Sequence, residues 1–97
     1  MIVLDSSFLV AYHNRRDAHH GAAAATMERL VASEWGPSLL PEYVFLEVVT
    51  VLLARRGLDV AVRVATILLQ ARDVDFVPSS DMFHDVMETF RLELEEI

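Results

Sequence analysis

The 97-residue sequence predicts an α/β fold, a three-layer α/β/α sandwich around a short parallel sheet. The chain opens on a short apolar run rich in β-branched residues at positions 2–4, which is typical of a strand buried on both faces of a parallel sheet. Apolar segments with helical spacing then alternate with two further strand-like segments. Such alternation predicts parallel strands joined by helical crossovers.

The expected order of elements is strand, helix, helix, strand, helix, helix, strand, helix. The helix at 41–56 has proline at its start, Glu42 in its first turn, two arginines in its last turn and Gly57 after its end. The strand at 74–77 alternates and is followed by proline, so we expect it near the edge of the sheet. The elements are expected at residues 2–4, 8–10, 19–32, 38–40, 41–56, 58–72, 74–77 and 82–94.

Length and composition predict a single domain spanning residues 1–97. The hydrophobic content of 54% is high for this size, so we expect some apolar surface to be buried against a partner. The longest apolar segment, 43–54, is too short for a membrane span and is interrupted by Glu47 and Thr50, so no membrane contact is expected. The first residues lack the basic flank and cleavage site of a signal peptide, so none is expected, and with no cysteine in the sequence a cytoplasmic location is the default expectation.

The net charge of −7 argues against a general nucleic-acid coat, because nonspecific binding depends on Lys and Arg that neutralise phosphates. It does not exclude a metal-dependent nuclease, in which carboxylates gather in the site and metal ions offset their charge. All eight basic residues are arginine, a side chain suited to bidentate contacts with phosphate or carboxylate.

Asp5 is the first candidate functional residue. It follows the opening strand, and ligands of open α/β sheets bind just outside the carboxyl ends of the strands. The alternative is helix N-capping, in which side-chain oxygens of Asp5, Ser6 or Ser7 accept hydrogen bonds from backbone N–H groups of the short helix that follows. Both a catalytic or metal-binding role and a capping role are compatible with these residues.

Glu47 is the second candidate. The helix at 41–56 is apolar around most of its circumference, so we expect it to be largely buried. Burying a lone ionised carboxylate is costly, so Glu47 needs a partner. One explanation is a contact with an arginine, or a raised pKa that keeps the Glu47 carboxyl protonated. The other is a metal ion that Glu47 shares with Asp5. Thr50, one turn further on, either lines the same polar spot or bonds back to the helix backbone.

The adjacent histidines His19 and His20 are expected to be surface or capping residues, with contact to a substrate as the alternative. Their rings point in different directions, unlike an i, i+4 pair of metal ligands. Asp17 is a plausible cap for the helix at 19–32.

The chain resembles the PIN domain, and in particular it resembles the toxins of VapBC toxin–antitoxin pairs. The resemblance is carried by Asp5 in Ile2-Val3-Leu4-Asp5-Ser6-Ser7, by Glu47 in Phe45-Leu46-Glu47-Val48, and by the order of elements. It implies a ribonuclease that binds Mg²⁺ or Mn²⁺ through clustered carboxylates, the metal polarising the phosphate and activating a water for in-line attack. Residue by residue, Asp5 matches the first acidic ligand, Glu47 the second, and Ser6 the small hydroxyl residue that supports the first.

The same resemblance implies an RNA substrate, an antitoxin partner and a homodimer. His20 stands where relatives often carry a histidine. The family's remaining acidic residues lie on and after a fourth strand, so we expect a domain whose last strand and helix are missing. No acidic residue from Asp81 onward matches that motif, and a hard-cation site with fewer carboxylates should bind Mg²⁺ more weakly.

Two other functions are compatible with the sequence. The first is a catalytically incomplete PIN-like interaction module that dimerises or binds an antitoxin, which the high hydrophobic content favours. The second is a phosphotransfer fold of the haloacid-dehalogenase type, which also uses an Asp at a strand end. That fold needs a second Asp two residues later, and position 7 is a serine.

Overall fold

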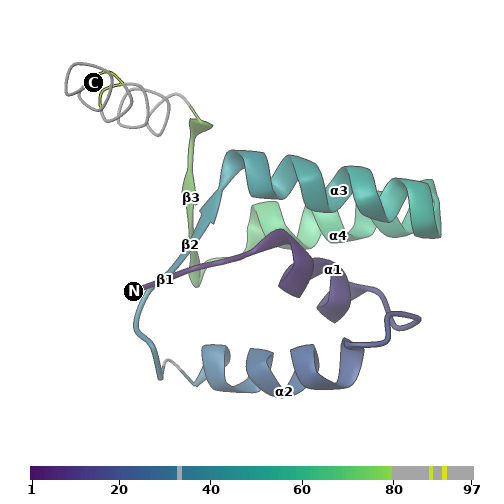
Figure 1. The fold of residues 1–97 in the computed structure, drawn as a ribbon, viewed down its shortest axis with the longest axis horizontal. Coiled ribbons are helices and arrows are strands. Elements are labelled where there is room, and N and C mark those ends of the chain that lie inside the picture. The colour runs from purple at the N-terminus through teal and green to yellow at the C-terminus, as the bar shows by residue number, and fades with distance from the viewer. Residues whose placement is uncertain (33, 80–87, 89–90, 92–97) are drawn as a thin grey trace.

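A computed structural model of the chain describes residues 1–32, 34–79, 88 and 91 (Figure 1). These residues form an α/β fold in which helices flank a three-stranded parallel sheet, as the sequence predicts. The elements are β1 (Ile2–Val3), α1 (Ser6–His13), α2 (His20–Val31), β2 (Ser38–Pro41), α3 (Glu42–Arg56), α4 (Leu58–Gln70) and β3 (Val74–Val77).

The central strand of the described sheet is β2, which pairs in parallel with β1 and with β3. Leu40 of β2 is fully buried, and β3 lies at one edge of the described sheet, as predicted. The expectation that the first strand is buried on both faces is wrong. Val3 is 55% exposed, because the two-residue β1 lies at the other edge of the described sheet, and only Leu4 just after it is buried.

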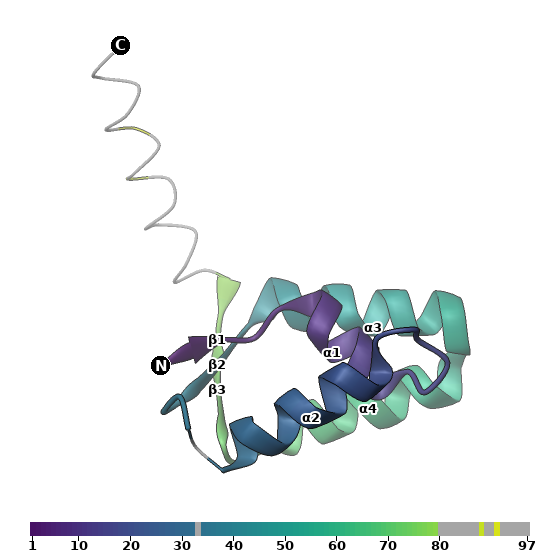
Figure 2. The same ribbon diagram turned by 60° about the horizontal axis from the view of Figure 1, so that its bottom comes forward.

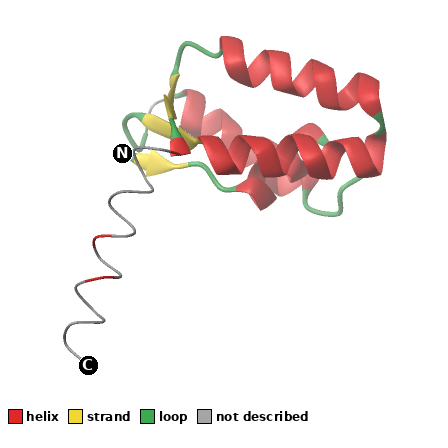
Figure 3. Ribbon diagram, turned by 90° about the horizontal axis from the view of Figure 1, so that it is seen from above, coloured by secondary structure: helices red, strands yellow, loops and turns green. Residues whose placement is uncertain are grey.

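The four helices extend from the sheet towards one end of the molecule (Figures 1 and 3). Turning the molecule brings α1 and α2 in front of α3 and α4 (Figure 2). The helix α1 packs against both α2 and α3, and α3 packs against α4. The core between them is made of buried aliphatic side chains, namely Leu4, Leu9, Val10, Leu40, Val44, Val48, Leu52, Ala61, Val64 and Leu68.

The helix α3 buries only one of its faces. Val44, Val48 and Leu52, which recur every four residues, pack into the core. Other apolar side chains of the same helix are about half exposed, including Leu53 at 47%. The expectation that this helix is largely buried is therefore wrong, because the face opposite the core has no neighbour among the described elements.

The ends of α3 agree with the prediction within one residue. Pro41 is the N-cap of the helix and also the last residue of β2, so the helix begins at Glu42. Gly57 follows the helix with φ of +92°, a conformation that favours glycine.

The last predicted helix, 82–94, lies outside the described residues except for Glu88 and Arg91. Glu88 is exposed and accepts a hydrogen bond from the Arg91 guanidinium. Asp81 and Asp85 lie outside the described residues. Within the described part of the chain, no helix is long and apolar enough to cross a membrane.

Candidate active site

Asp5 lies between β1 and α1, at the position predicted from the sequence. It is the N-cap residue of α1, and its backbone carbonyl accepts the first helical hydrogen bond, from the Leu9 N–H at 3.1 Å. Its side chain caps no backbone N–H of the helix and instead accepts a hydrogen bond from the Ser7 hydroxyl. Side-chain capping therefore does not account for the Asp5 carboxylate, which is exposed to solvent.

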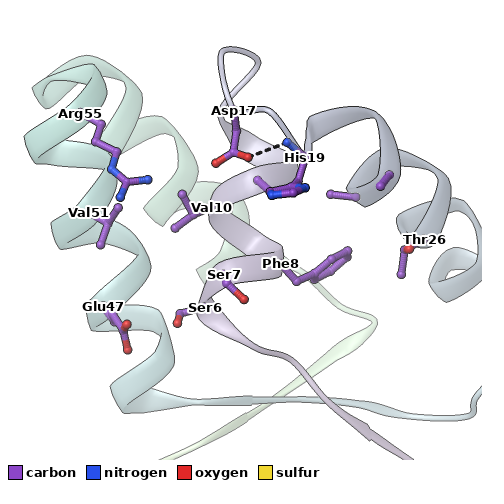
Figure 4. A pocket seen from close by; sticks show the side chains of 13 residues that line it. Ser6, Ser7, Phe8, Val10, Asp17, His19, Thr26, Glu47, Val51 and Arg55 are labelled. Carbon is purple, nitrogen blue, oxygen red and sulfur yellow. Dashed lines mark hydrogen bonds between the residues drawn. The ribbon is translucent and has the colours of Figure 1, made fainter.

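A cavity of about 490 Å³ lies between α1, α3 and the first half of α2 (Figure 4). Glu47, Val51 and Arg55 line it from three successive turns of α3. Ser6 and Ser7 line it from the first turn of α1, and Ser6 lies on the side of α1 nearer to Glu47 (Figure 4). The cavity is lined by Ser6, Ser7, Phe8, Val10, Ala11, Asp17, His19, Ala22, Ala23, Thr26, Glu47, Val51 and Arg55.

Two of the three predicted site residues line this cavity. Glu47 and Ser6 line it directly. Asp5 does not, but Ser7 both lines the cavity and donates its hydroxyl hydrogen to the Asp5 carboxylate. Two carboxylates and two hydroxyls therefore lie around the junction of α1 and α3.

The sequence argument for Glu47 is wrong about burial. Glu47 is exposed, because Val44 and Val48 occupy the core face of α3. An exposed carboxylate carries no large desolvation cost, so burial does not force a partner on Glu47. The Thr50 hydroxyl donates to the Leu46 carbonyl at 2.7 Å, which confirms the alternative in which this side chain bonds back to the helix.

The two histidines differ in their surroundings. His19 is the exposed N-cap residue of α2 and lines the cavity, and its backbone N–H donates to the Asp17 carboxylate at 2.8 Å (Figure 4). The expectation that Asp17 caps this helix is wrong, because the N-cap residue is His19 and α2 has no side-chain cap among the described residues; Asp17 instead forms a turn with His19 just before the helix begins. His20 is partly buried, with Nδ1 at 2.9 Å from the Ala11 carbonyl oxygen, and its ring stacks on Tyr12 at 6.5 Å between centroids.

The described oxygen donors fit a hydrated hard cation better than a closed metal cage. Within residues 1–32, 34–79, 88 and 91, no group of three or more His, Asp or Glu side chains could hold a metal ion. Asp5 and Glu47 are exposed carboxylates that water can reach. Mg²⁺ commonly keeps several waters and uses one or two carboxylates together with substrate phosphates, so this donor set suits Mg²⁺ or Mn²⁺.

Sequence reasoning missed two residues of this site. Ser7, rather than Ser6, bonds to Asp5, and the two-residue spacing after a strand is the signal that could have found this contact. Arg55 shares the cavity with Glu47 because residues eight positions apart lie on the same face of a helix.

This fold is that of a PIN domain, and the PIN domain family model matches residues 2–95. The chain belongs to the PIN domain family. Among solved structures it is similar to VapC20 of Mycobacterium tuberculosis, a sarcin-ricin loop cleaving toxin, with 30% sequence identity and a TM-score of 0.72. The match covers 93% of this chain and 66% of the toxin chain. No curated protein matches the sequence.

Proposed function

We propose that the chain is a metal-dependent endoribonuclease, the toxin component of a type II toxin–antitoxin pair, that cleaves RNA phosphodiester bonds. The observation that carries this proposal is the shared cavity in a PIN-family chain. Glu47 from α3 lines it together with Ser7, and Ser7 bonds to Asp5. Similarity to a toxin that cleaves the sarcin-ricin loop supports RNA as the substrate class.

In this proposal Asp5 and Glu47 hold Mg²⁺ or Mn²⁺. When bound, such an ion polarises the phosphate and lowers the pKa of a coordinated water. Ser7 orients the Asp5 carboxylate by donating to its Oδ2 atom, which favours a defined direction for the remaining oxygen. Ser6 lines the same cavity from the first turn of α1.

Exposed apolar side chains support a homodimer and an antitoxin as partners. Large apolar residues on the outer faces of α3 and α4 are about half exposed or more, namely Tyr43, Leu46, Leu53, Leu58, Val62, Ile67 and Leu69. Apolar surface of this kind is typical of protein contacts. A cytoplasmic location agrees with an RNA substrate and belongs to the same proposal.

The second candidate is an interaction module that binds its partners without cleaving RNA. The same exposed apolar side chains favour it, and so does a donor set of two carboxylates in the described part of the chain. The chain also spans only 66% of the toxin chain that it resembles.

Cleavage of an RNA that contains a sarcin-ricin loop separates these two functions. The purified chain is incubated with this RNA in Mg²⁺ or Mn²⁺, with a chelator as the metal-free control. Asp5→Asn and Glu47→Gln should each lose more activity than Ser7→Ala, for which a loss of roughly 10–100-fold is expected because Ser7 only orients a ligand. Glu42→Gln, in the first turn of the same helix, is the matched control.

The nuclease proposal is wrong if cleavage survives the chelator, or if it is unaffected by both carboxylate substitutions. Absence of cleavage together with stable dimers or capture of an antitoxin would favour the interaction module.

A further inference from the structure

A second cavity, of about 520 Å³, lies among all four helices. Its lining comes from the end of α1, the start of α2, the end of α3 and the length of α4. The connection from α1 to α2 and the end of α3 lie at the end of the helices away from the sheet (Figure 1). The function proposed above uses no residue of this cavity.

This cavity concentrates positive charge in an acidic protein. Three arginines line it, namely Arg15, Arg56 and Arg63, together with the rings of His13 and His20. The whole chain has a net charge of −7, yet no Asp or Glu is found among the described residues of this lining. The ion pairs of the described residues involve Arg29 and Arg91, and none involves an arginine of this cavity. An anion between these side chains would relieve their mutual repulsion.

Two of these side chains are held in place by neutral groups. Arg56 Nη1 donates to Asn14 Oδ1 at 2.8 Å, and that oxygen also accepts the Arg16 backbone N–H at 3.1 Å. Asn14 is 5% exposed, so its carboxamide is a fixed anchor. Because this carboxamide is neutral, it does not offset the positive charge of Arg56. The guanidinium also has four further N–H donors.

The histidine His20 is anchored in the same way. A carbonyl oxygen only accepts hydrogen bonds, so the 2.9 Å contact with the Ala11 carbonyl places a hydrogen on His20 Nδ1. Side chains anchored in this way lose little conformational freedom when they bind a ligand.

The two cavities are neighbours along three helices. On each of these helices, adjacent residues line the two cavities. The pairs, with the first-cavity residue first, are Ala11 and Tyr12, Ala23 and Ala24, and Arg55 and Arg56. The eight residues of α1 span roughly 12 Å at the usual helical rise, so the Asp5 end and the His13 end are separated by about that length. One extended RNA segment can reach both.

We propose that the second cavity binds a backbone phosphate of the RNA substrate, away from the bond that is cleaved. This inference rests on the proposed function, which makes RNA the substrate. Three arginines suit a phosphate, because each guanidinium can give two parallel hydrogen bonds to its oxygens. The contact is to the backbone, so it adds affinity and orientation without reading the base sequence.

Binding of a labelled single-stranded RNA to the full chain, with a chelator present, tests this inference. The variant Arg15→Gln/Arg63→Gln removes two exposed arginines of the cavity. The control Arg16→Gln/Arg72→Gln removes the same charge at two exposed positions outside both cavities. The cavity variant should bind RNA about tenfold more weakly than the unmodified chain. Its plot of the logarithm of the association constant against the logarithm of the salt concentration should be shallower, by about 0.7 for each phosphate that is no longer neutralised. The control should stay within about twofold of the unmodified chain.

Inorganic phosphate is the second probe. It should shift the NMR signals of the His13 and His20 rings in the unmodified chain and not in the cavity variant, and RNA should compete with it. Equal RNA affinity for the cavity variant and its control would overturn the inference. Phosphate that shifts the rings without being displaced by RNA would also overturn it, because the cavity would then be a site for free phosphate.

These measurements do not require cleavage. If no RNA is cleaved but the cavity variant still binds RNA more weakly than its control, the proposed function fails and the phosphate contact stands. If cleavage depends on Glu47 but the two arginine variants bind RNA equally, the phosphate contact fails and the proposed function stands.

Discussion

Replacing Leu52 with alanine tests whether the described packing of α3 fixes the direction of Glu47. Leu52 is fully buried, whereas its neighbour Leu53 on the same helix is 47% exposed. Leu52 and Glu47 are on the same helix, so the face that α3 turns to the core fixes where Glu47 lies. With Leu52 in the core, Glu47 lies at the first cavity. Leu53→Ala is therefore the matched control, with identical chemistry on another face of one helix.

The expected losses of stability follow from the two exposures. A Leu→Ala change removes three carbons, or about 2.4 kcal/mol of transfer free energy at about 0.8 kcal/mol each. The cavity left at a fully buried position adds to this, so Leu52→Ala should cost about 3–4 kcal/mol. At Leu53 roughly half of the transfer free energy applies and solvent fills the gap, so that loss should be about 1 kcal/mol.

Urea denaturation followed by circular dichroism measures both losses. The two variants should unfold with the same m-value as the unmodified chain, so the shift in midpoint reports stability alone. Equal losses for the two leucines, or a larger loss for Leu53, would refute the orientation of α3 and with it the position of Glu47.

Three further predictions concern the loops and helix ends. Asn14→Ala should lower the unfolding free energy in urea by about 2 kcal/mol, because Arg56 loses its bond to a buried carboxamide. An equal loss in Asn14→Asp, which keeps the acceptor, would contradict this. Burial lowers the pKa of His13 below its ordinary 6.5, so the unfolded chain binds the proton more readily and stability falls as pH drops below about 7. The pH dependence of the melting temperature should be flatter in His13→Gln, and an unchanged slope would count against this cause. Gly57→Ala should cost about 1–2 kcal/mol because its φ is +92°, while Gly21→Ala, inside α2 with open space around it, should raise stability by about 0.5–1 kcal/mol. Changes of the same sign in urea denaturation would contradict this pair of predictions.

The order of the elements could be predicted from local patterns alone. Residues 42–56 carry proline before the helix and glycine after it, and both ends are determined by backbone chemistry within a few residues. The position of Asp5 at a strand end is equally local. Such signals do not depend on what packs against the element.

Burial could not be predicted in the same way, because it depends on which neighbours cover each face. Glu47 was expected to be buried since its neighbours in sequence are apolar, yet Val44 and Val48 take the core face and leave Glu47 at the cavity. The contact between Ser7 and Asp5, and the anchoring of Arg56 by Asn14 across 42 positions, are products of tertiary structure. Sequence spacing could suggest the first of these contacts but not the second.

Calorimetric titration of the full chain with Mn²⁺ tests most directly whether Asp5 and Glu47 share a metal ion. Asp5→Asn and Glu47→Gln should each weaken Mn²⁺ binding by roughly tenfold or more, since each removes one of two carboxylate ligands. Glu42→Gln removes the same charge from the same helix and should bind Mn²⁺ like the unmodified chain. Unchanged Mn²⁺ affinity in Glu47→Gln, or an equal loss in Glu42→Gln, would contradict a metal site formed by these two carboxylates.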